Sequence, residues 1–96
     1  MTLLSKLSDI FQSKAQVKLL EYFLDNSGMQ RVFNQATLAN FLGQSPSTVA
    51  RIVEPLIKEK ILLYDRFDRG MKIFTLNEAE EKTKALIEFH RKLKEL

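Results

Sequence analysis

The sequence has no cysteine, three glycines, two prolines and a single histidine among its 96 residues. Without cysteine the chain forms neither disulfide bonds nor thiolate zinc sites. Because 45% of the residues are hydrophobic, the composition excludes a disordered chain and favours a folded domain rich in helix. A domain of this length buries a modest core, and an interface with another subunit would help to stabilise it.

The sequence also lacks a long apolar run. No stretch reaches the roughly 18 residues of a membrane span, and residues 1–6 do not lead into the apolar segment of a signal peptide. We therefore expect a soluble, cytoplasmic protein with no membrane partner. The formal net charge of +3 and the pI of about 9.3 favour an anionic partner without identifying one.

Hydrophobic periodicity predicts a single domain over 1–96 of the α+β class, mostly helical. The predicted segments are a helix over 3–11, a helix that begins at 13 and is ended by 26–28, a short strand at 31–33, helices over 34–42 and 45–56, hairpin strands at 61–65 and 71–76, and a helix over 77–96. Three core helices followed by a hairpin is the order of a winged helix-turn-helix. In this prediction 13–76 is the core and 77–96 is an added C-terminal helix.

Local signals define where the predicted helices begin and end. The predicted N-caps are Ser13, which forms a capping box with Gln16, then Asn34, and Ser45, which precedes Pro46. Gly43 permits the left-handed turn that ends the helix over 34–42. Pro55 conflicts with the helical pattern around it, and we expect it to kink the helix or to end it early.

The strongest functional signal is a pair of predicted helices joined by the three-residue turn 43–45. Ala39 lies four residues before Gly43, on the face that must approach the following helix, where a larger side chain would force the helices apart. Val49 and Ile52 turn the apolar face of the second helix toward the first. These are the spacings of the helix-turn-helix motif.

The run TLANFLGQSPSTVAR at residues 37–51 resembles winged-helix regulators of bacteria and archaea in the broad MarR- or ArsR-like superfamily. The resemblance extends from about residue 13 to residue 76. It implies a transcriptional regulator, a repressor, whose second motif helix enters the major groove of double-stranded DNA. Two residues depart from the pattern: Pro55 lies within the recognition helix, and Lys60 stands where such proteins often carry glycine.

The recognition helix has one stripe that is expected to face outward. Opposite the apolar positions, this stripe consists of Ser47, Thr48, Arg51, Glu54 and Lys58. Arg51 can form two hydrogen bonds with guanine or can contact a phosphate, and the sequence does not decide between them. Ser47 and Thr48 can contact DNA or can cap the helix. The predicted DNA-binding residues are Gln44, Ser45, Ser47, Thr48, Arg51, Lys58, Arg66, Arg69 and Lys72.

The predicted hairpin carries three cations near its tip, Arg66, Arg69 and Lys72. They suit a wing that touches the DNA backbone or reaches the minor groove. The alternative is a solvated hairpin whose cations protect an exposed sheet edge. Residues 44–76 hold six cations and four anions, whereas 78–96 hold five of each, so the excess positive charge lies with the motif.

The predicted C-terminal helix has an apolar stripe. Its members, at spacings of three, four and three, are Leu86, Phe89, Leu93 and Leu96. This spacing is typical of a coiled-coil seam, and we interpret it as the interface of a homodimer that places two recognition helices on a two-fold DNA site. The alternative is that the stripe packs on its own domain.

The sequence contains no motif that indicates catalysis. His90 with Glu88 nearby is a weak metal site in a chain without cysteine, and no phosphate-binding loop or nucleophile motif is present. We therefore expect no cofactor, no metal and no enzymatic activity, and the sequence identifies no small-molecule effector. The alternative to DNA binding is a winged helix that serves only as a protein-interaction module.

Overall fold

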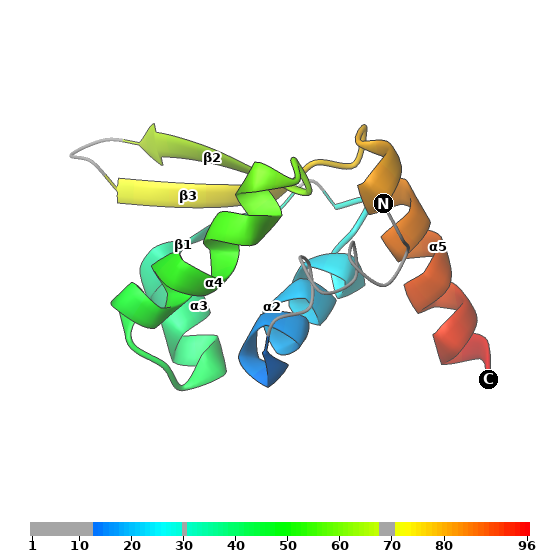
Figure 1. The fold of residues 1–96 in the computed structure, drawn as a ribbon, viewed down its shortest axis with the longest axis horizontal. Helices are drawn as coiled ribbons and strands as arrows, with labels where there is room; N and C mark the ends of the chain where they lie inside the picture. The colour runs from blue at the N-terminus through cyan, green and yellow to red at the C-terminus, as the bar shows by residue number, and fades with distance from the viewer. Residues whose placement is uncertain (1–12, 30, 68–70) are drawn as a thin grey trace.

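The computed structural model describes residues 13–29, 31–67 and 71–96. The predicted helix over 3–11, the hairpin turn at 68–70 and Arg69 lie outside these residues. The described elements follow the predicted order and are α2 (Lys14–Asp25), β1 (Val32–Asn34), α3 (Gln35–Leu42), α4 (Pro46–Lys58), β2 (Leu62–Phe67), β3 (Met71–Leu76) and α5 (Glu81–Glu95). In Figure 1 the β2–β3 hairpin lies at the left above α3 and α4, α5 lies at the right, and α2 lies between α3 and α5. The predicted fold class is confirmed.

The sheet is antiparallel, with β3 in the middle and β1 and β2 at its edges. Val32 of β1 and Leu63 of β2 both pair with Thr75, while Phe33 and Tyr64 pair with Phe74. The short strand β1, predicted one residue earlier, therefore completes a three-stranded sheet together with the hairpin. Strand β2 begins one residue later than predicted and extends two residues further toward the turn.

The hydrophobic core lies where α2, α3 and α4 meet the inner face of the sheet. Helix α4, the predicted recognition helix, contributes the four residues predicted to face inward, and all are buried: Val49, Ile52, Val53 and Leu56. Phe33 and Phe74, which are paired across β1 and β3, cover this cluster from the sheet. Burial of one helix face by both sheet and helices determines which side of α4 remains exposed.

The predicted N-caps are confirmed. Side-chain oxygens of Ser13, Asn34 and Ser45 accept hydrogen bonds from the backbone N–H three residues later. Gln16, predicted to be the second member of the capping box, has a role that the sequence did not reveal. Its fully buried side chain donates a hydrogen bond to the carbonyl of Ile52 over 3.0 Å, which joins α2 to α4.

Two predicted helix boundaries are wrong. Helix α4 does not end early at Pro55 but continues for three residues to Lys58, because the core holds its buried face in place on both sides of the proline. Helix α5 begins at Glu81 rather than at residue 77. Asn77 instead donates from its backbone to the carbonyl of Ile61 (2.8 Å), so the chain turns before the helix starts.

Lys60, between α4 and β2, has a left-handed backbone with φ 64°. Its carbonyl accepts a hydrogen bond from Nδ2 of Asn77 (2.9 Å), which holds this conformation against the end of β3. A side chain in the left-handed region costs about 1–2 kcal/mol. This strain is the physical reason why glycine suits the position.

We expect Lys60→Gly to raise the free energy of unfolding by about 1 kcal/mol, because glycine adopts positive φ without strain. The gain is smaller than the full strain, since glycine also makes the unfolded chain more flexible. Urea denaturation measures the change. Lys58→Gly is the matched control, because Lys58 lies within α4 and glycine there should lower stability by about 0.5–1 kcal/mol. A loss of stability in Lys60→Gly would contradict the strain at this residue.

A buried hydroxyl group near the start of α5 also costs stability. Thr83 is fully buried, and its Oγ1 has no hydrogen-bond partner in the part of the chain that the structure describes. We expect Thr83→Val to raise the free energy of unfolding by about 1 kcal/mol, because valine keeps the shape and removes the unsatisfied polar atom. Thr83→Ser, which keeps the hydroxyl and removes the methyl group, should destabilise the protein. Thermal denaturation of the three proteins tests this order, and a valine variant less stable than the parent would contradict it.

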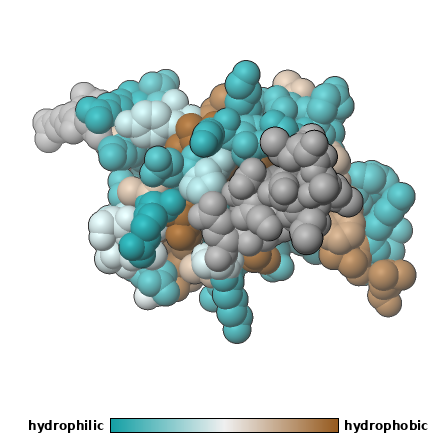
Figure 2. All heavy atoms as spheres, in the orientation of Figure 1, coloured by the Kyte–Doolittle hydropathy of each residue, from teal (hydrophilic) through white to brown (hydrophobic). Residues whose placement is uncertain are grey.

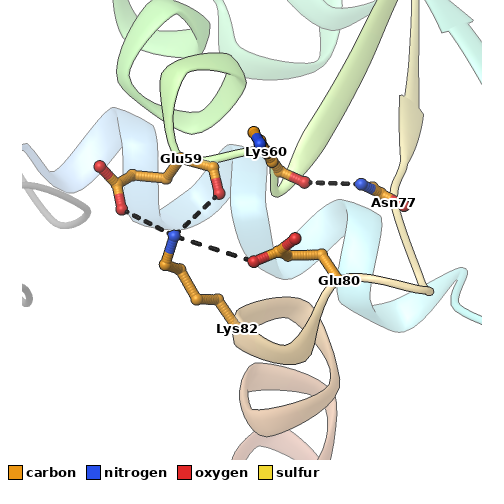
Figure 3. A network of polar contacts seen from close by, with 5 residues as sticks. All are labelled: Glu59, Lys60, Asn77, Glu80 and Lys82. Atoms are coloured by element: carbon orange, nitrogen blue, oxygen red, sulfur yellow. Dashed lines mark hydrogen bonds and ion pairs between the residues drawn. The ribbon is translucent and has the colours of Figure 1, made fainter.

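Helix α5 is attached to the rest of the molecule at both of its ends. Near its start, Nζ of Lys82 lies 3.2 Å from the carboxylate of Glu59 and 3.8 Å from that of Glu80, and it donates to the backbone carbonyl of Glu59 (Figure 3). These contacts tie α5 to Glu59, the C-cap residue of α4. A cation beside the last carbonyls of α4 also complements the helix dipole.

Toward its end, α5 is held to α2 by Asp25. The carboxylate accepts from Nζ of Lys94 (2.6 Å) and lies 2.8 Å from Nε2 of His90. The Lys94 ammonium, and then the His90 side chain, lower the pKa of Asp25 below its ordinary value. The pKa of Asp25 is lower in the folded state than in the unfolded state. The stabilisation that its carboxylate gives to the folded protein is therefore present above the unfolded-state pKa and is lost as pH falls through the folded-state pKa.

Candidate nucleic-acid interface

The helix-turn-helix is formed by α3, the turn at 43–45 and α4. Gly43 has φ 65° and ends α3, and the backbone N–H of Gln44 donates to the carbonyl of Ala39 over 3.0 Å. Ala39 is buried against the second helix, as its spacing predicted. No described helix is long and apolar enough to cross a membrane.

The outward stripe of α4 is open to solvent. Ser47, Arg51, Glu54 and Lys58 are exposed, and Thr48 is half-buried. Within the described part of the chain, Arg51 and Lys58 form no hydrogen bond or ion pair. Their charged groups are therefore not engaged by the residues that the structure describes and are available to a partner.

The hydroxyl groups at the start of α4 are already engaged with one another. Oγ of Ser45 lies 3.0 Å from Oγ of Ser47 and 3.0 Å from Oγ1 of Thr48, and it accepts from the N–H of Thr48. This arrangement is a helix cap. It gives the three hydroxyl groups predicted to contact DNA, those of Ser45, Ser47 and Thr48, a structural role. Arg51 is then the long side chain with free donors on the first two turns of α4.

Two hollows flank the start of α4. One, of about 320 Å³, lies between α2 and α4 and brings together Ser13, Gln44, Thr48 and Arg51. The other, of about 350 Å³, lies between α3, α4 and the hairpin, and it is lined by Asn34, Gln35, Pro46 and Lys72, with Ala36 and Met71. Sequence reasoning missed Gln35, whose side chain donates to the carbonyl of Pro46 over 2.6 Å. The only available signal was its position directly after the N-cap Asn34.

The hairpin places two of its predicted DNA-binding cations side by side. Arg66 of β2 and Lys72 of β3 are paired in the register and therefore share one face of the sheet, the face of Tyr64 and Phe74. Nε of Arg66 donates to the hydroxyl of Tyr64 (2.9 Å), which raises the pKa of Arg66 above its ordinary value. Like charges directly opposite one another are destabilising unless an anion lies between them.

The apolar stripe of α5 is only partly covered. Leu86 packs on the core, whereas Phe89 is 60% exposed, Leu93 51% exposed and Leu96 fully exposed. Figure 2 shows the hydrophobic surface at the end of α5, at the lower right. A groove of about 140 Å³ runs between α2 and α5 beside this stripe, lined mainly by apolar side chains. His90 contacts Asp25, and the described residues contain no group of three potential metal ligands.

No protein-family model matches the sequence, and no curated protein matches it. Solved structures do match. A "possible transcriptional regulator" from Methanosarcina mazei Go1 is 21% identical over 90% of this chain and 72% of that chain, with a TM-score of 0.64. MepR of Staphylococcus aureus in complex with DNA is 17% identical over 94% of this chain and 73% of that chain, with a TM-score of 0.65. RV1404 from Mycobacterium tuberculosis is 26% identical over 96% of this chain and 66% of that chain, with a TM-score of 0.61.

This chain has the winged-helix fold. The predicted resemblance to winged-helix regulators is confirmed at the level of the fold. The similar structures include regulators of transcription: MepR is described as a transcription regulator of the multidrug efflux pump MepA. Within the winged helix, α4 occupies the position of the recognition helix and β2 with β3 forms the wing.

Proposed function

We propose that this winged helix is a sequence-specific regulator of transcription that binds double-stranded DNA as a homodimer and acts as a repressor. The observation that carries the proposal is the outward stripe of α4. It lies opposite a fully buried face, it is exposed, and its cations have no partner within the described residues. A recognition helix in the major groove needs this combination of rigid support and free donors.

The charges of the wing also favour DNA as the partner. Arg66 and Lys72 face each other across β2 and β3, an arrangement that costs stability in isolation and is relieved by a polyanion. Lys72 also lines the hollow beside Pro46, at the start of the recognition helix. A DNA strand that passes between the recognition helix and the wing would meet both elements. MepR, which has the same fold, is known in complex with DNA.

The exposed stripe of α5 supports the homodimer. Phe89, Leu93 and Leu96 expose apolar side chains that a second copy would bury, and Leu86 continues the stripe into the core. Two copies joined through α5 would present two recognition helices to one DNA molecule. Because Lys82 and Asp25 tie α5 to α4 and α2, the interface would also fix the distance between the recognition helices.

Replacing Arg66 and Lys72 of the wing together by alanine is expected to weaken binding to all DNA sequences alike. Each cation lost from a phosphate contact should reduce the slope of log K against log salt by about one unit. Titration of duplex DNA at several salt concentrations measures the slope. Lys84 and Lys92 on α5 are the matched control, since their removal takes away the same charge far from the wing. An unchanged slope in the wing variant would mean that the hairpin has no role in DNA binding.

A protein-interaction module is the second candidate function, and one observation favours it. The outer face of the sheet exposes apolar side chains in a row, with Val32 and Leu63 on either side of Thr75 and Met71 nearer the turn. Selection of duplex sites from a random pool tests both candidates. The regulator predicts enriched sites with two inverted half-sites, whereas the interaction module predicts no enrichment.

A further inference from the structure

Glu54 lies among the outward residues of the recognition helix, yet it is an anion. It follows Arg51 by three residues and precedes Lys58 by four, so the three side chains share one face of α4. All three are exposed. A carboxylate on a surface that meets phosphates weakens binding to DNA of any sequence, so Glu54 does not contribute to sequence-independent affinity for DNA.

The carboxylate of Glu54 is not neutralised by its neighbours. In the described part of the chain it forms no hydrogen bond or ion pair, although Arg51 and Lys58 stand at spacings that permit one. Carboxylates on α5 behave differently: Glu81 pairs with Lys84, and Glu88 pairs with Arg91. The acceptor oxygens of Glu54 are therefore free to meet a donor that approaches α4 from outside.

The major groove offers a carboxylate few donors. Guanine and thymine present acceptor oxygens there, which repel an anion. Adenine presents its N6 amino group beside the N7 acceptor, so a carboxylate meets repulsion together with the hydrogen bond. Cytosine presents the N4 amino donor and has no acceptor on its own edge, so the nearest acceptor is O6 of the paired guanine. Among the four bases, cytosine is the one whose edge complements a free carboxylate.

We propose that Glu54 is a specificity-determining residue that accepts a hydrogen bond from the N4 amino group of one cytosine in each half-site. The inference rests on the proposed function, because it requires α4 in the major groove. The same negative charge that attracts cytosine disfavours the other bases at that position. Glu54 thus lowers affinity for DNA in general and raises the ratio of specific to non-specific binding.

The test is a selection of duplex sites from a random pool with the full chain and the variants Glu54→Gln and Glu54→Ala. The unmodified chain should prefer cytosine at one position of each half-site by about tenfold. Glutamine offers a donor and an acceptor together, so Glu54→Gln should move the preference at that position to adenine. Glu54→Ala should abolish it. Both variants should bind random duplex DNA several-fold more tightly than the unmodified chain.

Glu95→Gln is the control, because it makes the same change in net charge at the far end of α5 and should leave every base preference as it was. If the unmodified chain selects no duplex sequence, the proposed function itself is contradicted. If the unmodified chain selects sites and both Glu54 variants keep its base preferences unchanged, the inference alone is overturned. A position that depends on Glu54 but prefers adenine in the unmodified chain would overturn the assignment to cytosine.

Discussion

Replacing Phe89 and Leu93 together by glutamine is expected to convert a dimer into a monomer and to lower affinity for a two-half-site DNA by a factor of about 10²–10⁴. Both side chains are more than half exposed in the single chain, so the change removes little from its own core. In the proposed dimer they would form the centre of the apolar seam. Without the seam each half-site is bound separately, and the second binding event loses the advantage of linkage. Sedimentation and DNA titration measure the two effects.

The matched control for the dimer variant is the replacement of Val32 and Leu63 by glutamine. These residues are exposed to a similar degree but lie on the outer face of the sheet, away from α5. The control should remain a dimer and should bind DNA as the unmodified chain does. If the unmodified chain is monomeric at micromolar concentration, the dimer model is wrong. If the sheet variant is the one that becomes monomeric, the interface lies on the sheet instead.

Replacing Arg51 by alanine is expected to cost about 1–3 kcal/mol of site-specific binding, which corresponds to a loss of about 5- to 150-fold. Arg51 is exposed on α4 and forms no hydrogen bond or ion pair within the described residues, so the domain should keep its stability. Binding isotherms on a selected site measure the loss, and urea denaturation verifies the fold.

The pattern of the loss distinguishes the two roles that Arg51 can have. If it binds guanine, the alanine variant should lose preference at one base pair. If it binds a phosphate, affinity should fall for all sequences alike, together with a smaller salt slope. The hollow that Arg51 shares with Ser13 and Gln44 is compatible with a phosphate. Arg31→Ala, at an exposed arginine outside α4, is the control, and equal losses in the two variants would contradict the proposed docking face.

Local signals predicted much of the fold because they act between residues that are close in sequence. An N-cap needs only a short polar side chain and the N–H three residues later, so Ser13, Asn34 and Ser45 were identified from their neighbours alone. Gly43 was found in the same way, since a left-handed residue must end α3 before the turn. The buried face of α4 followed from helical periodicity.

The failures all involve tertiary contacts. By local rules Pro55 should have kinked α4 or ended it early, and the early end is overturned because the packed core keeps the last turn in place. Asn77 begins no helix, because its backbone and side chain are engaged by Ile61 and Lys60 across the structure. Gln16 was taken only as a capping residue, and its bond to Ile52 joins residues 36 positions apart.

The features of the candidate site that follow from helical geometry were predicted from the sequence. The features that depend on side-chain conformation or on tertiary contacts were missed. Arg51 and Lys58 follow from the buried stripe of α4, so their exposure could be read from spacing. The engagement of Ser47 and Thr48 by Ser45 needs side-chain rotamers that the sequence does not specify. The proximity of Lys72 to Pro46 needs the hairpin to fold back on α4, a contact between distant segments.

Binding of the full chain to random duplex DNA across a range of salt concentrations tests the central claim most directly. The account predicts that log K falls linearly with log salt, with a slope of several units that reflects phosphates contacted by the recognition helix and the wing. It also predicts that a selected site binds more tightly than random DNA at every salt concentration. Absence of binding to duplex DNA even at low salt would contradict the account and would leave the winged helix as a protein-interaction module.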